Sequence, residues 1–346
     1  MDISAIANRA LKSAGEAVAS EPNAAEKLAH LASGEMTAVN AIILERMGSP
    51  VPLIPKLAKY LVEAGGKRVR PLVTIAAANM IGYRGDAHLK LAAAVEFIHT
   101  ATLLHDDVVD ESDLRRGKKP ANLVWGNAPS VLVGDFLFAR AFMLMVDAGS
   151  MPALHSLSRA SSIIAEGEVR QLAAKGDIAA SIGSYMEIIE AKTAALFASA
   201  AEVSAIVADR PQNEITALDT YGRELGLAFQ LVDDALDYGG LAKALGKNTG
   251  DDFREGKITL PVVIALQHGD EREKRFWSRV MTDGDQDDSD FDMAIELLDR
   301  HEALDATLDM AREKSRIAKR ALDAFPDNEW KAALADLADF VVRRAS

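Results

Sequence analysis

Five long stretches of this chain place apolar residues three and four positions apart, the spacing that one buried face of an α-helix requires. They are rich in Ala and Leu, and no stretch sustains the alternation of β-branched residues that is typical of strands. The stretches cover residues 27–47, 86–110, 153–175, 184–208 and 212–238. This pattern predicts an all-α protein with helices packed mostly antiparallel around one core.

The segments between these stretches are short and rich in Gly, Pro or Asp. The expected loops are Gly65–Gly66, 116–129 with Pro120 and Pro129, 246–256 and 283–290. None of them separates halves of different composition, and no repeat of fixed period is visible. We therefore expect a single domain over residues 1–346, with an N-terminal helical extension at 1–34 and the motifs at about 35–265.

Composition and charge exclude several classes of protein. The chain has 346 residues, of which 49% are hydrophobic, enough for a large core. It has no cysteine, which excludes disulfides, thiolate zinc sites and cysteine nucleophiles. The net charge of −13 argues against a nucleic-acid partner. The N-terminal residues lack the apolar core of a signal peptide, and no uncharged apolar run reaches the roughly 18 residues of a membrane span, so we expect a cytoplasmic protein.

Two aspartate clusters, "LLHDDVVDES" at 103–112 and "QLVDDALDYG" at 230–239, each close an apolar helical stretch. Asp106 and Asp110 are four positions apart, so they lie on one helix face about 6 Å apart along the axis. Asp233 and Asp237 have the same spacing. Such a pair suits Mg²⁺, which accepts one or two carboxylates together with water and phosphate oxygens. The aspartates at 283–292 follow no apolar period, and we interpret them as a solvated loop.

Basic residues are concentrated near these clusters although the chain as a whole is acidic. They are Lys67, Arg68, Arg70, Arg115, Arg116, Lys118, Lys119, Lys192, Lys247 and Lys257. Carboxylates that bind Mg²⁺ beside Arg and Lys indicate a phosphate-rich anion held between the two. The alternative is that Arg115 and Arg116 only neutralise Asp110 and Asp113 in surface ion pairs.

Several motifs resemble those of the trans-isoprenyl diphosphate synthases, also called polyprenyl synthetases. They are "GGKRVRP", "EFIHTATLLHDDVVDESDLRRGKKPANLVWGNAPSVLVGDFLFARAF", "AKTAALF", "GLAFQLVDDALDY" and "LGKNTGDDFREGKITLP". The resemblance implies a bundle of long helices around a deep central cavity, usually as a homodimer. It also implies Mg²⁺, with three ions bound in the presence of substrate, and two substrates, isopentenyl diphosphate and an allylic diphosphate.

The same resemblance implies a role for each matching residue. The metal ligands would be Asp106, Asp110, Asp233 and, in support, Asp237. The allylic diphosphate would contact Arg115, Lys192, Lys247 and Lys257, although the loop between the last two is one residue longer than in farnesyl synthases. Isopentenyl diphosphate would contact Lys67, Arg70, His99 and Arg116. Thr193 and Gln230 would line the place where the allylic cation forms, and Asp106, Asp110, Asp233, Lys192 and Arg115 would be catalytic.

Product length should depend on the helix that precedes Asp106. Thr102, Ala101 and Ile98 lie four, five and eight positions before it, along the expected path of the growing chain. In short-chain members of the family, bulky aromatic residues at the first two places form a floor, whereas both residues are small here. Residues 138–146 are expected to supply the opposing wall, with Met143 and Met145 as fillers. The motif at 96–112 resembles octaprenyl to decaprenyl synthases of ubiquinone biosynthesis, with farnesyl or geranylgeranyl diphosphate as primer.

Several alternatives stay open from the sequence. A shorter-chain synthase would need a blocking residue elsewhere in the cavity. A terpene cyclase would typically replace the second aspartate motif, and a non-catalytic subunit of a heteromeric synthase would tend to lose the carboxylates. A metal-buffering helical protein would not need Lys67, Arg115 and Arg116. We expect no transmembrane segment, and at most a transient membrane contact when a long product leaves.

Overall fold

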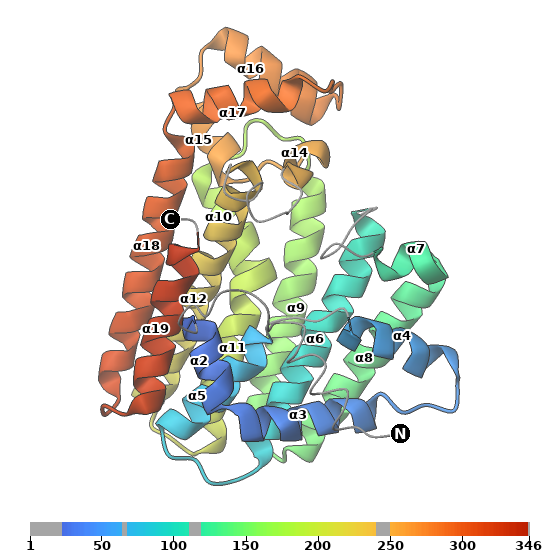
Figure 1. Ribbon diagram of the computed structural model, residues 1–346, viewed down its shortest axis with the longest axis vertical. Coiled ribbons are helices and arrows are strands. Elements are labelled where there is room, and N and C mark those ends of the chain that lie inside the picture. Colours follow the sequence, from blue (N-terminus) through green and yellow to red (C-terminus); the bar gives the residue numbers. More distant parts are fainter. Residues whose placement is uncertain (1–22, 64–67, 111–118, 240–249, 345–346) are drawn as a thin grey trace, which may run out of the picture.

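Every regular element in the described part of the chain is a helix, which confirms the all-α prediction (Figure 1). The computed structural model describes residues 23–63, 68–110, 119–239 and 250–344. The predicted stretches 86–110, 153–175 and 212–238 each form one long helix. Their apolar faces are buried against one another, as the helical spacing of apolar residues requires.

The first half of the chain supplies one side of the bundle. Its helices are α2 (Ala24–Leu31), α3 (Ser33–Arg46), α4 (Leu53–Glu63), α5 (Val69–Met80), α6 (Ala87–Val109), α7 (Ala121–Trp125), α8 (Asn127–Asp147) and α9 (Met151–Ala173). The second half begins with α10 (Ile182–Ile189), the π-turn η1 (Glu190–Ala194), α11 (Ala195–Val207) and α12 (Gln212–Tyr238). It ends with α14 (Asp251–Arg254), α15 (Leu260–His268), α16 (Glu271–Trp277), η2 (Ser278–Thr282), α17 (Asp290–Arg300), α18 (Ala303–Ala321), η3 (Leu322–Ala324) and α19 (Glu329–Arg343).

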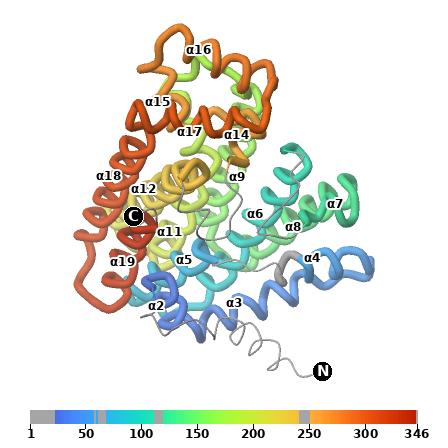
Figure 2. Tube along the Cα trace, turned by 45° about the horizontal axis from the view of Figure 1, so that its top comes forward, coloured from blue at the N-terminus to red at the C-terminus, as the bar shows by residue number. Residues whose placement is uncertain are grey.

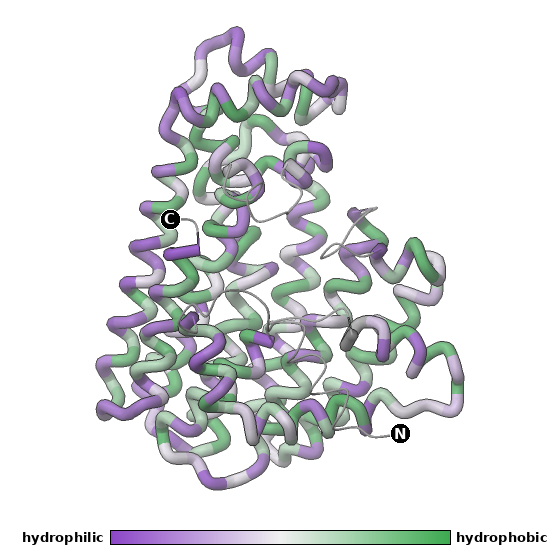
Figure 3. Tube along the Cα trace, in the orientation of Figure 1, coloured by the Kyte–Doolittle hydropathy of each residue, from purple (hydrophilic) through white to green (hydrophobic). Residues whose placement is uncertain are grey.

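The core lies between two outer layers of helices. In both views α18 and α19 stand at one side and α7 and α8 at the other, with α6, α11 and α12 between them (Figures 1 and 2). Helices α5 and α11 consist largely of small residues and are buried along most of their length. Hydrophilic residues are frequent on α18 at the outer edge, whereas the inner helices are mainly hydrophobic (Figure 3).

Some local expectations from the sequence are wrong. Residues 116–129 are not one loop, because α7 and the first turn of α8 occupy most of the described part of this range. Pro120 precedes α7 and Pro129 lies in the first turn of α8, where a missing N–H removes no helical hydrogen bond. The expected loop at 246–256 contains the short helix α14.

Two further differences concern helix boundaries. The stretch 27–47 is divided at Ala32 into α2 and α3, and α2 has its own capping box at Asn23 and Glu26. The acidic loop ends at residue 289, because Asp290 begins α17. Within the predicted solvated range 283–292, the Asp290 carboxylate is buried and accepts a 2.9 Å hydrogen bond from Arg279 Nη1, whereas Asp292 is exposed on α17.

Candidate active site

The first aspartate cluster stands at the C-terminal end of α6. Asp106 is in the last turn of the helix and Asp110 caps it, and both side chains are half-buried. Lys192 Nζ lies 3.7 Å from Asp106 Oδ2, and Lys257 Nζ lies 2.8 Å from Asp110 Oδ2. Two lysines from distant parts of the chain therefore face Asp106 and Asp110, the two carboxylates that lie four positions apart.

The second cluster stands near the C-terminal end of α12, and its three aspartates have different surroundings. Asp233 is half-exposed and lies 3.2 Å from the Arg344 guanidinium at the end of α19. Asp234 is buried and accepts hydrogen bonds from Tyr185 Oη and Gln230 Nε2. Asp237 accepts from the backbone N–H groups of residues 251 and 252, and so fixes the start of α14.

One aspartate of each cluster, Asp110 and Asp234, lines a cavity of about 180 Å³, whereas Asp106, Asp233 and Asp237 are not among its lining residues. Its lining includes Asp110, Lys192, Thr193, Gln230, Asp234 and Lys257. These residues come from α6, η1, α12 and the segment after α14, which are far apart in the sequence. The fold thus brings the acidic and basic residues of the motifs to one place.

A π-turn positions Lys192 and Thr193 beside the cavity. Within η1 the extra residue per turn interrupts the helix that the sequence predicts as continuous over 184–208. Glycines on both neighbouring helices allow a close approach: a Cβ on Gly167 would lie 2.8 Å from Ala191 Cβ, and one on Gly226 would lie 2.7 Å from Ala194 Cα. No periodicity in the sequence could show this turn.

Burial dominates the electrostatics of the second cluster. It raises the pKa of Asp234 to about 7, although the hydrogen bonds from Tyr185 and Gln230 oppose the rise. Burial, followed by the charges of Asp234 and Asp237, raises the pKa of Asp252 well above its usual value. Burial alone would lower the pKa of Lys257, but the charge of Asp110 and its hydrogen bonds outweigh it and raise that pKa. Burial therefore favours the protonated, neutral forms of Asp234 and Asp252 in the absence of added cations.

The raised pKa of Asp234 gives a prediction for the stability of the metal-free protein. Between about pH 4 and about pH 7, folded Asp234 keeps a proton that the unfolded chain has lost, because its folded pKa is raised to about 7. The contribution of Asp234 to the free energy of unfolding is therefore complete below about pH 4 and is lost as the pH rises through 7. We expect Asp234→Asn to remove on the order of 1–4 kcal/mol of this pH dependence.

Urea unfolding at several pH values tests this expectation. The exposed Asp288→Asn serves as the matched control, because its side chain lies in the acidic loop outside the site. The curve of unfolding free energy against pH should be flatter for Asp234→Asn than for the wild type or the control. Parallel curves for all three proteins would contradict the raised pKa of Asp234 in the folded protein.

The remaining predicted substrate residues are only partly described. Arg70, at the start of α5, places its guanidinium carbon 4.3 Å from the centre of the Phe197 ring. His99 is half-buried on α6, and its backbone carbonyl accepts a hydrogen bond from Thr102. The predictions for Lys67, Arg115, Arg116 and Lys247 fall outside the described residues.

The residues predicted to control product length lie on the buried part of α6. Ile98 and Ala101 are fully buried and Thr102 is half-buried, and none of the three lines the 180 Å³ cavity. Met145 is buried in the core as expected. Met143 is not a core filler, because 45% of its surface is exposed and its sulfur accepts a hydrogen bond from Arg140.

The donor set fits a metal that substrate completes. No group of three His, Cys, Asp or Glu side chains within the described ranges could hold an ion by itself. Asp106 and Asp110 instead offer carboxylates one helical turn apart beside cationic side chains. Mg²⁺ keeps several waters and is usually bound through one or two carboxylates plus phosphate oxygens, so this arrangement suits it.

Sequence reasoning missed four residues that contact the site residues. Tyr185 binds Asp234, Glu168 binds Lys192 at 2.8 Å, and Arg344 contacts Asp233. Asp252 donates its backbone N–H to Asp237. Tyr185 precedes Lys192 by seven positions, which is two helical turns, so that position could have been considered. Asp252 lies within the motif at 245–261, and nothing in the sequence marks Glu168 or Arg344.

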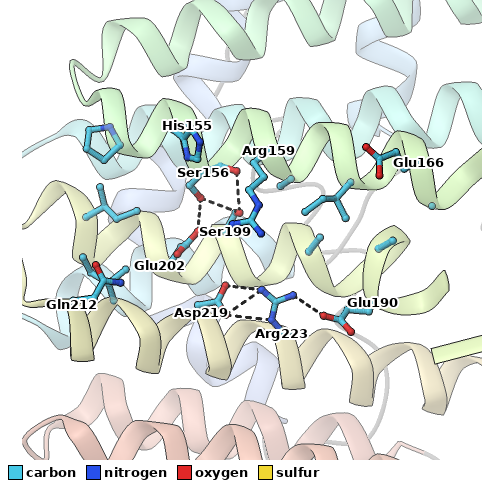
Figure 4. A pocket seen from close by; sticks show the side chains of 18 of the residues that line it. His155, Ser156, Arg159, Glu166, Glu190, Ser199, Glu202, Gln212, Asp219 and Arg223 are labelled. Carbon is cyan, nitrogen blue, oxygen red and sulfur yellow. Dashed lines mark hydrogen bonds and ion pairs between the residues drawn. The ribbon is translucent and has the colours of Figure 1, made fainter. Parts of the chain in front are cut away.

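A larger hollow of about 670 Å³ lies on the outer face between α9, α11 and α12 (Figure 4). Its polar side chains bind one another: Ser156 donates to Glu202 Oε1 at 2.5 Å, and Arg223 bridges Asp219 and Glu190. The lining of this hollow contains no residue of the two aspartate clusters and neither Lys192 nor Lys257.

An all-α bundle in which one aspartate from each of two clusters lines a cavity together with two lysines is typical of the class of isoprenoid synthases. The chain belongs to the polyprenyl synthetase family, whose model matches residues 51–298. This confirms the resemblance that the sequence motifs indicate.

The chain is also similar to individual members of the family over almost its whole length. It is 46% identical to the octaprenyl diphosphate synthase of Escherichia coli K12, covering 92% of this chain and 98% of that one. A polyprenyl synthase structure from Caulobacter crescentus CB15, complexed with calcium and isoprenyl diphosphate, is 56% identical, has a TM-score of 0.89 and covers 93% and 98% of the two chains. A decaprenyl diphosphate synthase structure from Rhodobacter capsulatus is 52% identical, has a TM-score of 0.90 and covers 93% and 99%.

Proposed function

We propose that this protein is a long-chain trans-polyprenyl diphosphate synthase. It would condense isopentenyl diphosphate repeatedly onto farnesyl or geranylgeranyl diphosphate, giving an octaprenyl or decaprenyl product for the ubiquinone side chain. The observation that supports this most directly is the pair of contacts at the end of α6, where Lys192 meets Asp106 and Lys257 meets Asp110. The small residues on α6 below Asp106 support a long product.

Asp106, Asp110, Asp233 and Asp237 are the residues that would hold Mg²⁺, with three ions expected together with substrate. When bound, Mg²⁺ supplies Lewis-acid stabilisation of the charge on the departing pyrophosphate. Lys192 and Lys257 now contact the carboxylates, and both ammonium groups can turn to the diphosphate when metal neutralises those carboxylates. Arg115 and Lys247 complete this proposed allylic diphosphate site.

Isopentenyl diphosphate would bind to a second group of side chains, Lys67, Arg70, His99 and Arg116. Its double bond then attacks the allylic cation, which forms beside Thr193 and Gln230 when the C–O bond to pyrophosphate breaks. The new carbon–carbon bond leaves a tertiary cation, which loses a proton to the released pyrophosphate and becomes the allylic diphosphate for the next cycle. A closed cavity orients the two reactants and excludes water, which would otherwise quench the cation. Pyrophosphate release that requires Mg²⁺ and both substrates would support this reaction, whereas no release with any allylic primer would overturn it.

A homodimer is proposed from the outer face of α8. Leu132 and Val146 are 65% and 63% exposed, and Val131, Phe142 and Met143 extend the same apolar face.

Helix α8 is also the one helix among the described residues that is long and apolar enough to cross a membrane. Helices of soluble proteins can have the same length and composition, and α8 carries Asp135 and Arg140. We propose that a second copy covers this face in a cytoplasmic protein, with a transient membrane contact for product release.

Charge placed on this face should separate the two copies. We expect the double variant Leu132→Glu/Val146→Glu to elute near the 37.1 kDa mass of one chain in size-exclusion chromatography with light scattering. Met293→Glu, at an exposed apolar residue of α17, is the matched control and should remain dimeric. A monomeric wild type, or a double variant that stays dimeric, would contradict this interface.

A further inference from the structure

Three hydrogen bonds join α10, α12 and η1 into one chain at the cavity wall. Tyr185 Oη donates to Asp234 Oδ2 at 2.5 Å, and Gln230 Nε2 donates to Asp234 Oδ1 at 2.7 Å. Thr193 Oγ1 donates to Gln230 Oε1 at 2.8 Å. All four residues line the cavity. This series of hydrogen bonds therefore connects the buried Tyr185 to Gln230 and Thr193, the two residues beside which the allylic cation is proposed to form.

The direction of each bond in this chain follows from the chemistry of the groups. The Tyr185 hydroxyl is a donor, because burial keeps its pKa well above the usual value and the phenol stays protonated. With Asp234 ionised, both of its oxygens can only accept, so the Gln230 amide presents its nitrogen to Asp234 Oδ1 and leaves its oxygen for Thr193. The Thr193 hydroxyl donates its hydrogen to Gln230, so the lone pairs of its oxygen take no part in that bond.

We propose that Tyr185 is a positioning residue that fixes the orientation of the Gln230 amide through Asp234. The proposal rests on the proposed function, in which an allylic cation forms beside Thr193 and Gln230. With the amide as observed, oxygen atoms of both residues stand at the cavity wall and stabilise positive charge. With the amide reversed, an N–H group would stand there instead and oppose the cation.

Tyr185 is required in this proposal because the Asp234 carboxylate could rotate without its hydrogen bond. The carboxylate is 3% exposed and lies between Asp233 and Asp237, so it needs donors on both oxygens to hold one position. Phenylalanine at 185 would keep the ring and its packing but remove one donor. Asp234 could then rotate, and the Gln230 amide would lose the partner that distinguishes its two orientations.

The first test compares two Tyr→Phe variants. Tyr185→Phe should lower kcat about tenfold, the usual effect of one hydrogen bond to a charged group, and leave both KM values within about twofold of wild type. Tyr221→Phe is the matched control, because Tyr221 is also buried and donates to the Leu334 carbonyl away from the cavity. It should lower the melting temperature similarly and leave kcat unchanged. Equal kcat losses in both variants, or a rise in KM alone for Tyr185→Phe, would overturn the proposal.

A double-mutant cycle tests whether Tyr185 acts through Gln230. Gln230→Met removes the amide while keeping a side chain of similar length. If the tyrosine acts only through this amide, adding Tyr185→Phe to Gln230→Met should cause no further loss of kcat. Losses that multiply in the double variant would show that the two residues act independently, and would overturn the proposal.

A measurement on the metal-free wild type does not depend on activity or on a variant that folds. The side-chain amide protons of Gln230 should exchange slowly with solvent and give two well-separated signals by NMR. Rapid exchange with signals at the positions of a free amide would overturn the hydrogen-bonded orientation. Failure of the proposed function would appear differently, as a wild type that releases no pyrophosphate while this amide remains protected.

Discussion

Asp106→Asn and Asp233→Asn should each lower kcat on the order of a thousandfold, because each removes a charged metal ligand where pyrophosphate leaves. The substitutions keep the size of the side chain. The two carboxylates belong to different helices, α6 and α12, so the account requires that loss of either one disables the same reaction. Lys192 would still have Glu168 as a partner after the first substitution, so the local packing should persist.

Stability and activity must be measured together in these variants. Circular dichroism should show unchanged helix content, and pyrophosphate release with saturating substrates should show the loss of turnover. Asp288→Asn, in the exposed acidic loop, is the matched control and should keep full activity. Folded Asp106→Asn or Asp233→Asn protein with a rate within about threefold of wild type would remove the metal role from that residue.

Ala101→Phe should shorten the product to about the farnesyl or geranylgeranyl size while pyrophosphate release continues. Ala101 is fully buried on α6 five positions before Asp106, so a large ring there would close the proposed path of the growing chain. Such an insertion into a packed core costs about 1–3 kcal/mol unless there is space for the ring. Thr102→Phe, at a half-buried position one residue further along, offers a less demanding second variant.

The control for this experiment is Ala92→Phe. Ala92 is equally buried on α6, but nine positions away, which turns it to the opposite face of the helix. It should lower stability without changing product length, as measured by mass spectrometry of the hydrolysed products. An unchanged product spectrum in both Ala101→Phe and Thr102→Phe would mean that the growing chain does not pass these residues.

Helix periodicity and aspartate spacing predict the main helices and the two aspartate pairs, whereas Lys192 and Thr193 could be chosen only from the resemblance to the family. The apolar stretch 86–110 becomes α6 with Asp106 and Asp110 at its end, and 212–238 becomes α12. These predictions succeed because both depend on local geometry: an amphipathic helix has a fixed period, and residues four apart must share a face.

Features that depend on contacts between distant segments could not be predicted in this way. The π-turn at η1 is seated against Gly167 and Gly226 on two other helices. Arg344 meets Asp233 only because α19 packs beside α12. The helical turns of α7 and α14 fall where Pro and Gly favoured loops, since a proline before or in the first turn does not oppose a helix.

The central claim is that this synthase makes long chains, and the product of the wild-type protein tests it most directly. Purified protein would be incubated with Mg²⁺, farnesyl diphosphate and excess isopentenyl diphosphate, and the hydrolysed products would be sized by mass spectrometry. The account predicts that chains of eight to ten isoprene units predominate. A product that stops at four units or fewer would contradict it.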